Sequence, residues 1–245
     1  IPVQLKILYF TNTFSHYRTP IWKKLIELKK HEIFFHFSFE SFSGIEGSKW
    51  ESNFFKSIKN LKFFGVIFWQ RGVLKKVIFD KYDSLLLLGE MTILSNWIAS
   101  IIARIKNKKV IFWGHGIYGN EKGLKRILRL MFLRLSNYHF LYGNHAKKLL
   151  INEGFKSENL LVIYNSLDVE TQNQYYLEEK VDTKLNFLKT EKYILFTGRL
   201  TKIKELDLLF KSLEILNKKN DLLSVVIVGE GNEKARLQRK YSKLI

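Results

Sequence analysis

The sequence predicts an α/β protein in which parallel strands alternate with covering helices. Short apolar runs bounded by turn residues recur along the chain, and amphipathic stretches of helical period separate them. The chain has 245 residues, of which 46% are hydrophobic, so it can bury the core of one large domain or of two smaller ones. We therefore expect doubly wound sheets with helices packed against them.

Each expected element follows from its own stretch of sequence. Pro20 suits the first turn of a helix, where its missing N–H costs nothing. Strands are predicted at Lys6–Phe10, Ile33–Phe37, Leu61–Phe64, Ser84–Leu88, Val110–Trp113, Tyr138–Leu141 and Leu160–Ile163. Helices are predicted at Pro20–Lys30, Val73–Phe79, Ile93–Ile105, Leu124–Leu135 and Asn144–Glu153. Residues 41–55 are predicted to form a loop.

A change of composition after residue 168 divides the chain. Residues 1–168 form the predicted first domain, and the polar residues 169–192 indicate a connection between domains that contains some helix. Residues 193–245 open a second domain, with strands at 193–197 and 223–228 and helices near 204–217 and from 233 onward. Two strands and two helices are too few for a complete doubly wound domain, so we expect this second domain to be incomplete.

Charge and cysteine content limit the function classes. A net charge of +18 favours polyanionic partners, such as phosphorylated substrates, nucleic acid or an anionic membrane, although solvated surface or coding bias explains such an excess equally well. The absence of cysteine excludes disulfides, thiolate catalysis and cysteine metal sites, and it fits a reducing compartment. The longest hydrophobic segment, Met91–Ala103, is shorter than the roughly 20 residues that a membrane-spanning helix needs.

Two cations follow the predicted strand at 193–197. Gly198 permits close backbone approach, and Arg199 and Lys204 bring positive charge to the start of the next helix. Ligands of α/β sheets bind outside the carboxyl ends of the strands, so a phosphate or diphosphate site is expected here. The alternative is that both cations merely cap surface turns.

The next strand ends in a second glycine turn, in which Gly229 and Gly231 flank Glu230. One Gly-x-Gly is a weak signal, and the third glycine of the dinucleotide fingerprint is absent, so we expect no nicotinamide site. Two successive glycine turns in one small domain indicate a nucleotide-sized anion held across neighbouring strand ends.

The stretches "FTGRLTKIKELDLLFKSLEIL" and "VVIVGEGNEKARL" resemble the donor-binding half of the retaining GT-B glycosyltransferases of family 4. Upstream, "GNHAKKLLINEGFKSENLLVIYNSLDVE" and "VIFWGHGIYGN" resemble that family's helix–glycine–strand segment and its histidine-bearing loop. The resemblance covers nearly the whole chain and is specific over residues 140–235. It implies a GT-B fold of two Rossmann-like domains.

The resemblance also implies roles for individual residues. Arg199 and Lys204 would bind the diphosphate of a nucleotide-sugar donor and stabilise the leaving group, as catalytic and donor-binding residues. The resemblance also implies that the donor is bound by Gly198, Gly229, Glu230, Gly231 and Asn165. His115 would contact the reacting sugar or the acceptor, although a histidine satisfied by its own tight turn is the structural alternative.

The sequence departs from the family pattern at several points. The Gly-Gly loop is replaced by "TNTFSHYRTP", in which His16 and Arg18 would take acceptor or phosphate contacts. Tyr164 and Ser166 replace a proline and a glycine, and Glu205 stands where the family commonly has glycine, which places a negative charge near the phosphate site. The family's Glu-x7-Glu pair is expected beyond Ile245.

A basic amphipathic helix is predicted at Leu124–Leu135. Its apolar stripe consists of Leu124, Ile127, Leu128, Met131 and Leu135, and its basic stripe of Lys122, Lys125, Arg126 and Arg129. Such a helix can lie on an anionic membrane, although a sheet-covering helix with a solvated basic face shows the same pattern. Most aromatic residues lie inside apolar runs, as in "IFFHFSF", which indicates packing and argues against nucleic-acid binding.

The expected function is transfer of a sugar, of the hexosyltransferase type, from a nucleotide-diphosphate sugar to a glycan or lipid-linked acceptor. The resemblance implies retention at the anomeric carbon and neither a cofactor nor a required metal. It also implies a role in cell-surface polysaccharide synthesis, in the cytoplasm or on the inner face of the plasma membrane. The alternative is a noncatalytic nucleotide or polyanion binding protein.

Overall fold

The computed structural model describes residues 3–38, 55–178, 192–218 and 223–242, with the side chain of His16 left out. Contacts divide the chain into two compact units, Ile1–Gln172 (unit 1) and Asn173–Ile245 (unit 2), which are treated one at a time. The loop predicted at 41–55 lies outside the described residues except for Phe55, where the prediction is wrong because Phe55 begins a strand, β3 (Phe55–Ser57).

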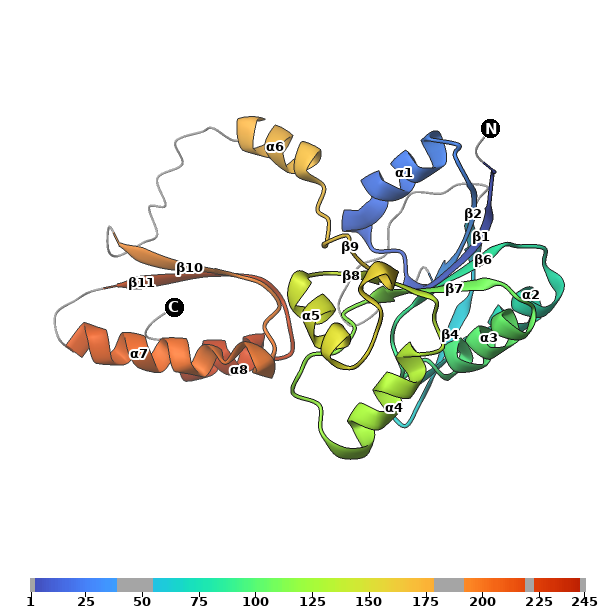
Figure 1. Cartoon of the computed structure of the whole chain (residues 1–245). Helices are drawn as coiled ribbons and strands as arrows, with labels where there is room; N and C mark the ends of the chain where they lie inside the picture. The colour runs from blue at the N-terminus through green and yellow to red at the C-terminus, as the bar shows by residue number, and fades with distance from the viewer. Residues whose placement is uncertain (1–2, 39–54, 179–191, 219–222, 243–245) are drawn as a thin grey trace. The chain divides into compact units, whose positions relative to one another are not determined.

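Unit 1 is built on a seven-stranded parallel sheet with the order β3-β2-β1-β6-β7-β8-β9 (Figure 1). Its strands are β1 (Lys6–Thr13), β2 (Glu32–Ser38), β3 (Phe55–Ser57), β6 (Ser84–Leu88), β7 (Lys109–Gly114), β8 (Tyr138–Leu141) and β9 (Leu160–Val162). From β1 the chain builds outward through β2 to β3, and it then returns to add β6 on the other side of β1. The order therefore reverses between β1 and β6, and such switch points are where ligands bind in open α/β sheets.

Helices cover both faces of this sheet, and side chains alternate between the two cores. Tyr9 packs with Trp22 and other aromatic residues on the face covered by α1, whereas Leu8 and Phe10 face the core beneath α2, α3 and α4. The helices of unit 1 are α1 (Thr19–Glu27), α2 (Val73–Phe79), α3 (Leu94–Ile105), α4 (Gly123–Leu133) and α5 (Asn144–Asn152), with 3-10 turns at His16–Arg18 and Ser157–Asn159. α6 (Val169–Glu178) crosses the boundary between the units.

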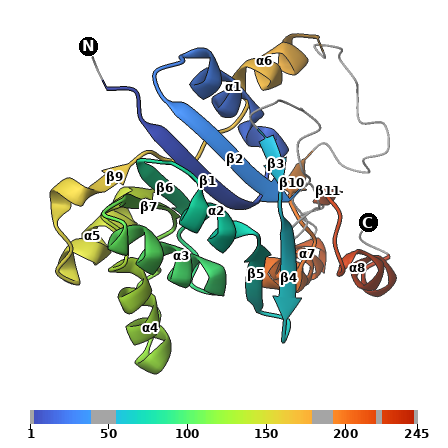
Figure 2. The ribbon, with the colours of Figure 1, turned by 90° about the vertical axis from the view of Figure 1, so that its right-hand side faces the viewer.

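The structure corrects the predicted elements in the region that follows β3. β4 (Lys59–Phe63) pairs antiparallel with β5 (Ile67–Arg71), which was not predicted, to form a hairpin outside the main sheet (Figure 2). The turn of the hairpin contains Phe64, which has a positive φ of 48° and is 93% exposed. An apolar residue at such a turn hides the usual turn signal, and this is why the sequence pattern missed the hairpin.

Unit 2 contains the parallel pair β10 (Tyr193–Thr197) and β11 (Ser224–Val228), followed in each case by a helix. A 3-10 turn at Lys202–Lys204 leads into α7 (Leu206–Lys218), and α8 (Lys234–Lys240) follows β11. The core of this unit includes Phe210 stacked on Tyr241, with ring centroids 4.4 Å apart. Both glycine turns predicted from the sequence thus follow strand ends.

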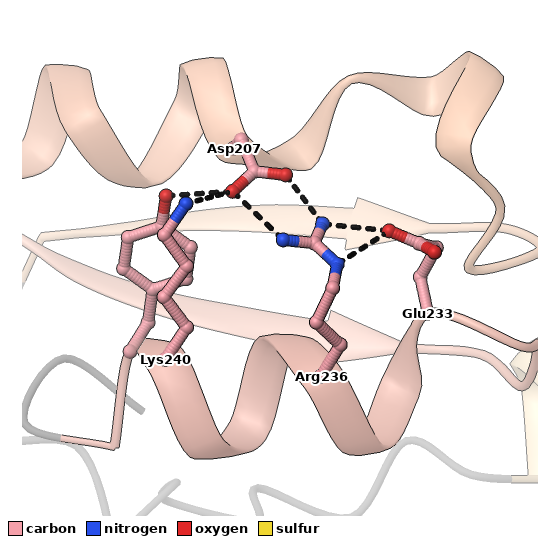
Figure 3. Close-up of polar contacts among 5 residues, drawn as sticks. Asp207, Glu233, Arg236 and Lys240 are labelled. Atoms are coloured by element: carbon pink, nitrogen blue, oxygen red, sulfur yellow. Dashed lines mark hydrogen bonds and ion pairs between the residues drawn. The ribbon is translucent and has the colours of Figure 1, made fainter.

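A network of charged side chains joins α7 and α8 in unit 2 (Figure 3). The carboxylate of Asp207, in the first turn of α7, accepts hydrogen bonds from Arg236, from Lys240 at 2.7 Å and from the Tyr241 hydroxyl at 2.8 Å. Glu233 accepts a further bond from Arg236 Nε at 2.7 Å. These bonds lower the pKa of Asp207 below its ordinary value, so the network is charged at neutral pH and holds α7 against α8.

Candidate functional site

A cavity of about 260 Å³ opens at the carboxyl ends of the central strands of unit 1. It lies beside the switch point between β1 and β6, and residues at the ends of β1, β6 and β7 line it. Its lining consists of Thr11, Asn12, Thr13, Ser15, Tyr17, Arg18, Leu88, Gly89, Glu90, Gly114, His115, Arg129, Tyr142 and Asn165. Seven of these fourteen residues carry hydroxyl or amide side chains, so the unit 1 cavity suits a polar ligand rich in hydroxyls.

Arg18 is the buried cation of this cavity and is only 8% exposed. Its guanidinium carbon lies 4.9 Å from the centroid of the Trp113 ring. Nη2 donates hydrogen bonds to the Tyr142 hydroxyl at 2.7 Å and to Asn165 Oδ1 at 3.2 Å. Residues far apart in the sequence therefore hold the guanidinium in one place at the end of the sheet.

His115 follows β7 directly and lines the same cavity as Arg18. Its ring lies 4.7 Å from the Tyr142 ring and 5.5 Å from the Tyr118 ring, measured between centroids. Loss of water lowers the pKa of His115 below its ordinary value; Arg18 and Arg129 lower it further, and Glu90 opposes them. The imidazole is therefore neutral at pH 7 and can both donate and accept a hydrogen bond.

A buried ion pair fixes the loop that carries His115. The Glu121 carboxylate accepts hydrogen bonds from the backbone N–H of Tyr118, at 3.1 Å, and of Gly119, at 3.0 Å. Arg129 Nε lies 3.2 Å from Glu121 Oε1, with side-chain exposures of 7% and 5% respectively. The sequence did not predict the pair of Glu121 and Arg129. Its pattern shows neither the path of the loop nor which residues of α4 are buried.

Asn165 lies in the turn after β9, where it adjoins Arg18 in the unit 1 cavity. Its neighbour Tyr164 has a φ of 57°, a backbone angle that proline cannot adopt, so this turn differs from a Pro-Asn-Gly turn. Asp168 Oδ1 accepts the backbone N–H of Thr171 at 3.1 Å and caps α6. His16 lies in the 3-10 turn before α1, and its side chain is outside what the structure describes.

In unit 2 the two glycine turns, residues 198–200 and 229–231, are joined through the main chain. The N–H of Gly198 donates to Val228 O at 3.0 Å, and the N–H of Leu200 donates to Glu230 O at 2.8 Å. A Cβ at Gly229 would lie 1.9 Å from Gly198 O, and one at Gly231 would lie 2.1 Å from Leu200 O. Only glycine allows the turns to approach this closely.

The predicted phosphate-binding cations lie on and after the first of these turns. Arg199 and Lys204 are both exposed, Arg199 within the turn and Lys204 at the end of the 3-10 turn that precedes α7. Glu205, which follows Lys204, adopts the left-handed conformation with φ 50° and ψ 38°. A glycine would adopt this conformation without strain, which gives a physical reason for the glycine of the family pattern. Glu230 pairs with Lys234 at 2.5 Å, and its side chain is 79% exposed.

Four of the five residues of the predicted apolar stripe are exposed, and only Leu135, which follows the end of α4, packs against the core. Leu124 is 70% exposed and Ile127 is 55% exposed, whereas α4 packs through Leu130, Phe132 and Leu133. Arg129, predicted on the basic stripe, is buried. The two apolar sets interleave along the helix, so their period alone could not distinguish the packed face from the free one.

No helix within the described part of the chain is long and apolar enough to cross a bilayer. Likewise, the described His, Asp and Glu side chains form no group of three or more that could hold a metal ion.

Part of the chain matches a known family. Residues 178–245, most of unit 2, match the model of "Glycosyl transferases group 1". No curated protein matches the chain.

Solved structures extend the fold comparison to nearly the whole chain. The UDP-GlcNAc 2-epimerase from Neisseria meningitidis bound to UDP-GlcNAc is 18% identical, with a TM-score of 0.60 over 98% of this chain and 71% of that one. The S. aureus MnaA–UDP structure is 16% identical, with a TM-score of 0.60 over 98% and 66%. The lipopolysaccharide outer core galactosyltransferase WaaB is 14% identical, with a TM-score of 0.56 over 98% and 65%.

These likenesses establish the fold class. The α/β fold of the GT-B type, with Rossmann-like units, is confirmed. This chain spans about two thirds of the length of these proteins, since it covers 65% of WaaB and 66% of MnaA.

Proposed function

We propose that this chain belongs to a glycosyltransferase of the hexosyltransferase type, which moves a sugar from a nucleotide-diphosphate sugar to a glycan or lipid-linked acceptor. The observation that carries the proposal is the pair of glycine turns joined through the main chain, with Arg199 and Lys204 beside them, in the segment that matches "Glycosyl transferases group 1". The donor binds to residues 193–245, the acceptor binds to residues 1–168, and residues 169–192 connect them.

In the proposed reaction Arg199 and Lys204 neutralise the charge that develops on the departing diphosphate. Gly198, Gly229 and Gly231 let the nucleotide approach the main chain, with Glu230 as a further donor contact, whereas Asn165, predicted as a donor residue, lies in the unit 1 cavity beside Arg18. The acceptor hydroxyl attacks from the face that the diphosphate leaves, which retains the configuration at the anomeric carbon.

On the acceptor side, His115, Arg18 and His16 contact the reacting sugar or the acceptor. Because partial loss of solvent and neighbouring arginines lower the pKa of His115, its imidazole is neutral at pH 7 and contacts hydroxyl groups through hydrogen bonds. We propose that transfer requires neither an organic cofactor nor a metal, since two cationic side chains supply the positive charge at the leaving group.

The donor site is tested by titrating UDP and GDP, with and without an attached sugar, into the 245-residue chain by calorimetry. We expect one nucleotide to bind, and we expect Arg199→Ala/Lys204→Ala to weaken its affinity by at least roughly 100-fold, because each charged hydrogen bond contributes about 1.5–3 kcal/mol. The control Lys211→Ala/Lys218→Ala removes the same charge from exposed positions of α7 and should leave the affinity unchanged.

Failure of every nucleotide to bind would contradict the transferase proposal. Equal losses in the two double variants would show that net charge, rather than these turns, attracts the ligand. Nucleotide binding without sugar transfer to any added acceptor would favour the noncatalytic nucleotide-binding alternative.

We further propose that unit 1 contacts an anionic membrane from the cytoplasmic side, on the inner face of the plasma membrane, during cell-surface polysaccharide synthesis. In both views the β4–β5 turn and the first turn of α4 project from the same end of unit 1 (Figure 1, Figure 2). Phe64 is 93% exposed at the hairpin turn and Leu124 is 70% exposed at the start of α4. Lys62 and Lys125, both exposed, stand beside them.

This arrangement suits the interfacial region of a bilayer, where apolar side chains enter and lysines contact anionic headgroups. A second copy of the chain is a poorer partner, because each copy carries a net charge of +18 and the copies repel one another.

Phe64→Ser/Leu124→Ser is expected to weaken binding to vesicles that contain phosphatidylglycerol by at least about tenfold, because each side chain contributes roughly 1.5–3 kcal/mol on burial. Sedimentation with vesicles measures the loss. The control Val3→Ser/Leu28→Ser changes residues that are 77% and 59% exposed elsewhere on unit 1. Equal binding of both variants, or equal binding of the wild type to uncharged phosphatidylcholine vesicles, would contradict the proposal.

A further inference from the structure

We propose that the unit 1 cavity binds an oxyanion, a phosphate or carboxylate group of the acceptor, and that Arg18 is its counter-ion. The inference rests on the proposed sugar transfer and names the chemical class of the acceptor. The guanidinium of Arg18 is buried among neutral groups, and not all of its N–H donors have a hydrogen-bond partner among the described residues.

Burying a guanidinium is costly unless an opposite charge compensates it. Among the described residues, Arg18 forms no ion pair with a carboxylate, although eight other ion pairs are present in the same residues. Its neighbours are the Trp113 ring, the Tyr142 hydroxyl and the Asn165 amide, all of which are neutral. The compensating charge is therefore expected from a ligand.

The guanidinium also has donors that its neighbours do not use. Both hydrogen bonds from Arg18 to described residues leave from Nη2, and no described residue accepts a hydrogen bond from Nη1 or Nε; Nε is closed to solvent, so Nη1 is the donor that a ligand can reach. A guanidinium carries five N–H donors in a fixed plane, and this plane matches the two oxygens of a carboxylate or phosphate. The cation–π contact with Trp113 and the two Nη2 bonds hold the guanidinium in advance, so a ligand loses little affinity to ordering the side chain.

The other charged or titratable groups that line the cavity are less suited than Arg18 to pair with an oxyanion. The charge of Arg129 is offset by Glu121, 3.2 Å away. Partial loss of solvent lowers the pKa of His115; Glu90 opposes this, the two arginines lower the pKa further, and the imidazole is neutral at pH 7. Glu90 is the carboxylate of the lining, so it is expected to accept hydrogen bonds from ligand hydroxyls while the oxyanion lies on the Arg18 side.

The rest of the lining fits a sugar that carries such a group. Thr11, Thr13, Ser15 and Tyr17, which carry hydroxyls, and Asn12, which carries an amide, are among the residues that line the cavity. Its volume of about 260 Å³ lies near the lower limit of ligand pockets, so one sugar with a single anionic substituent is a better match than a nucleotide.

The test compares the affinities of glucose 1-phosphate, glucuronate and glucose for the 245-residue chain. We expect the phosphate or the carboxylate sugar to bind at least tenfold more tightly than glucose, and the two anionic sugars distinguish the two sources of the oxyanion. The comparison uses the wild-type chain, so it decides the inference without a variant that must fold. Equal affinity for all three sugars would overturn it.

Variants then assign the effect to the guanidinium. Arg18→Met should bring the anionic sugars to the affinity of glucose, and Arg18→Lys should keep part of the preference. Arg71→Met, an exposed arginine outside the cavity lining, should keep all of it. A preference that survives in a folded Arg18→Met chain would overturn the role of Arg18.

The donor is tested separately. Arg18→Met should leave the UDP affinity unchanged, and a matching loss of UDP affinity would overturn the assignment of the oxyanion to the acceptor. If the wild type binds no nucleotide but still prefers the anionic sugars, the proposed function fails while the anion site stands.

Discussion

Replacing Gly229 with alanine is expected to unfold the glycine turns of unit 2 and to abolish nucleotide binding. The new Cβ would lie 1.9 Å from Gly198 O and 2.9 Å from Gly198 C, which are main-chain atoms that cannot rotate away. The residue also has a φ of 153°, where a side chain costs about 1–3 kcal/mol before any collision. Together these effects should exceed about 4 kcal/mol, the range of severe substitutions.

Gly198→Ala is the matched control, because Gly198 has nearly the same φ, 150°, but open space around the added atom. Its Cβ would meet only the Phe196 ring, at 3.5 Å. This variant should lose about 1–3 kcal/mol of stability from backbone strain alone. Hydrogen exchange of peptides from β10, β11 and α7 measures both losses, and equal protection in the two variants would contradict the close approach of the turns.

The second large effect is expected from Arg129→Met in unit 1. The substitution leaves the buried Glu121 carboxylate without its cation, and breaking such a pair costs about 3–5 kcal/mol. It also removes the hydrogen bond from Arg129 Nη1 to Gly116 O, at 3.2 Å. All five tryptophans lie in unit 1, so urea unfolding followed by tryptophan fluorescence reports the stability of that unit.

Arg126→Met provides the control on the same helix. Its side chain is 51% exposed and pairs with Glu153 at the surface, so the loss should be no more than about 1 kcal/mol. The double variant Glu121→Gln/Arg129→Met should regain part of the stability lost in Arg129→Met, because no unpaired charge stays buried. If the double variant were less stable than Arg129→Met, the lone carboxylate would not be the cause of the loss.

The sheet of unit 1 was largely predictable because its strands are buried apolar runs. Ser84–Leu88 and Tyr138–Leu141 have the predicted bounds, since turn residues flank each run closely. β5 was missed because its hairpin turns at Phe64 and Gly65, where a bulky aromatic residue occupies a left-handed position that the pattern assigns to small polar residues.

The candidate site was likewise predictable from the sequence only in part. Arg199 and Lys204 are near one another in the sequence and follow a strand, so their pattern could be recognised directly. The surroundings of Arg18 could not be predicted, because its hydrogen-bond partners Tyr142 and Asn165 lie 124 and 147 residues away. The left-handed backbone of Glu205 was likewise hidden, since glutamate gives no sequence signal for that conformation.

The main-chain hydrogen bonds between the two glycine turns also bear on how such a site can diversify. Gly198 and Leu200 donate, and Val228 and Glu230 accept, through peptide groups that nearly every residue type possesses. The backbone geometry of the two turns therefore depends on the glycines. The exposed side chains of Arg199 and Glu230 take no part in these main-chain hydrogen bonds. Evolution can exchange those side chains, and with them the preferred ligand, without a new backbone having to arise.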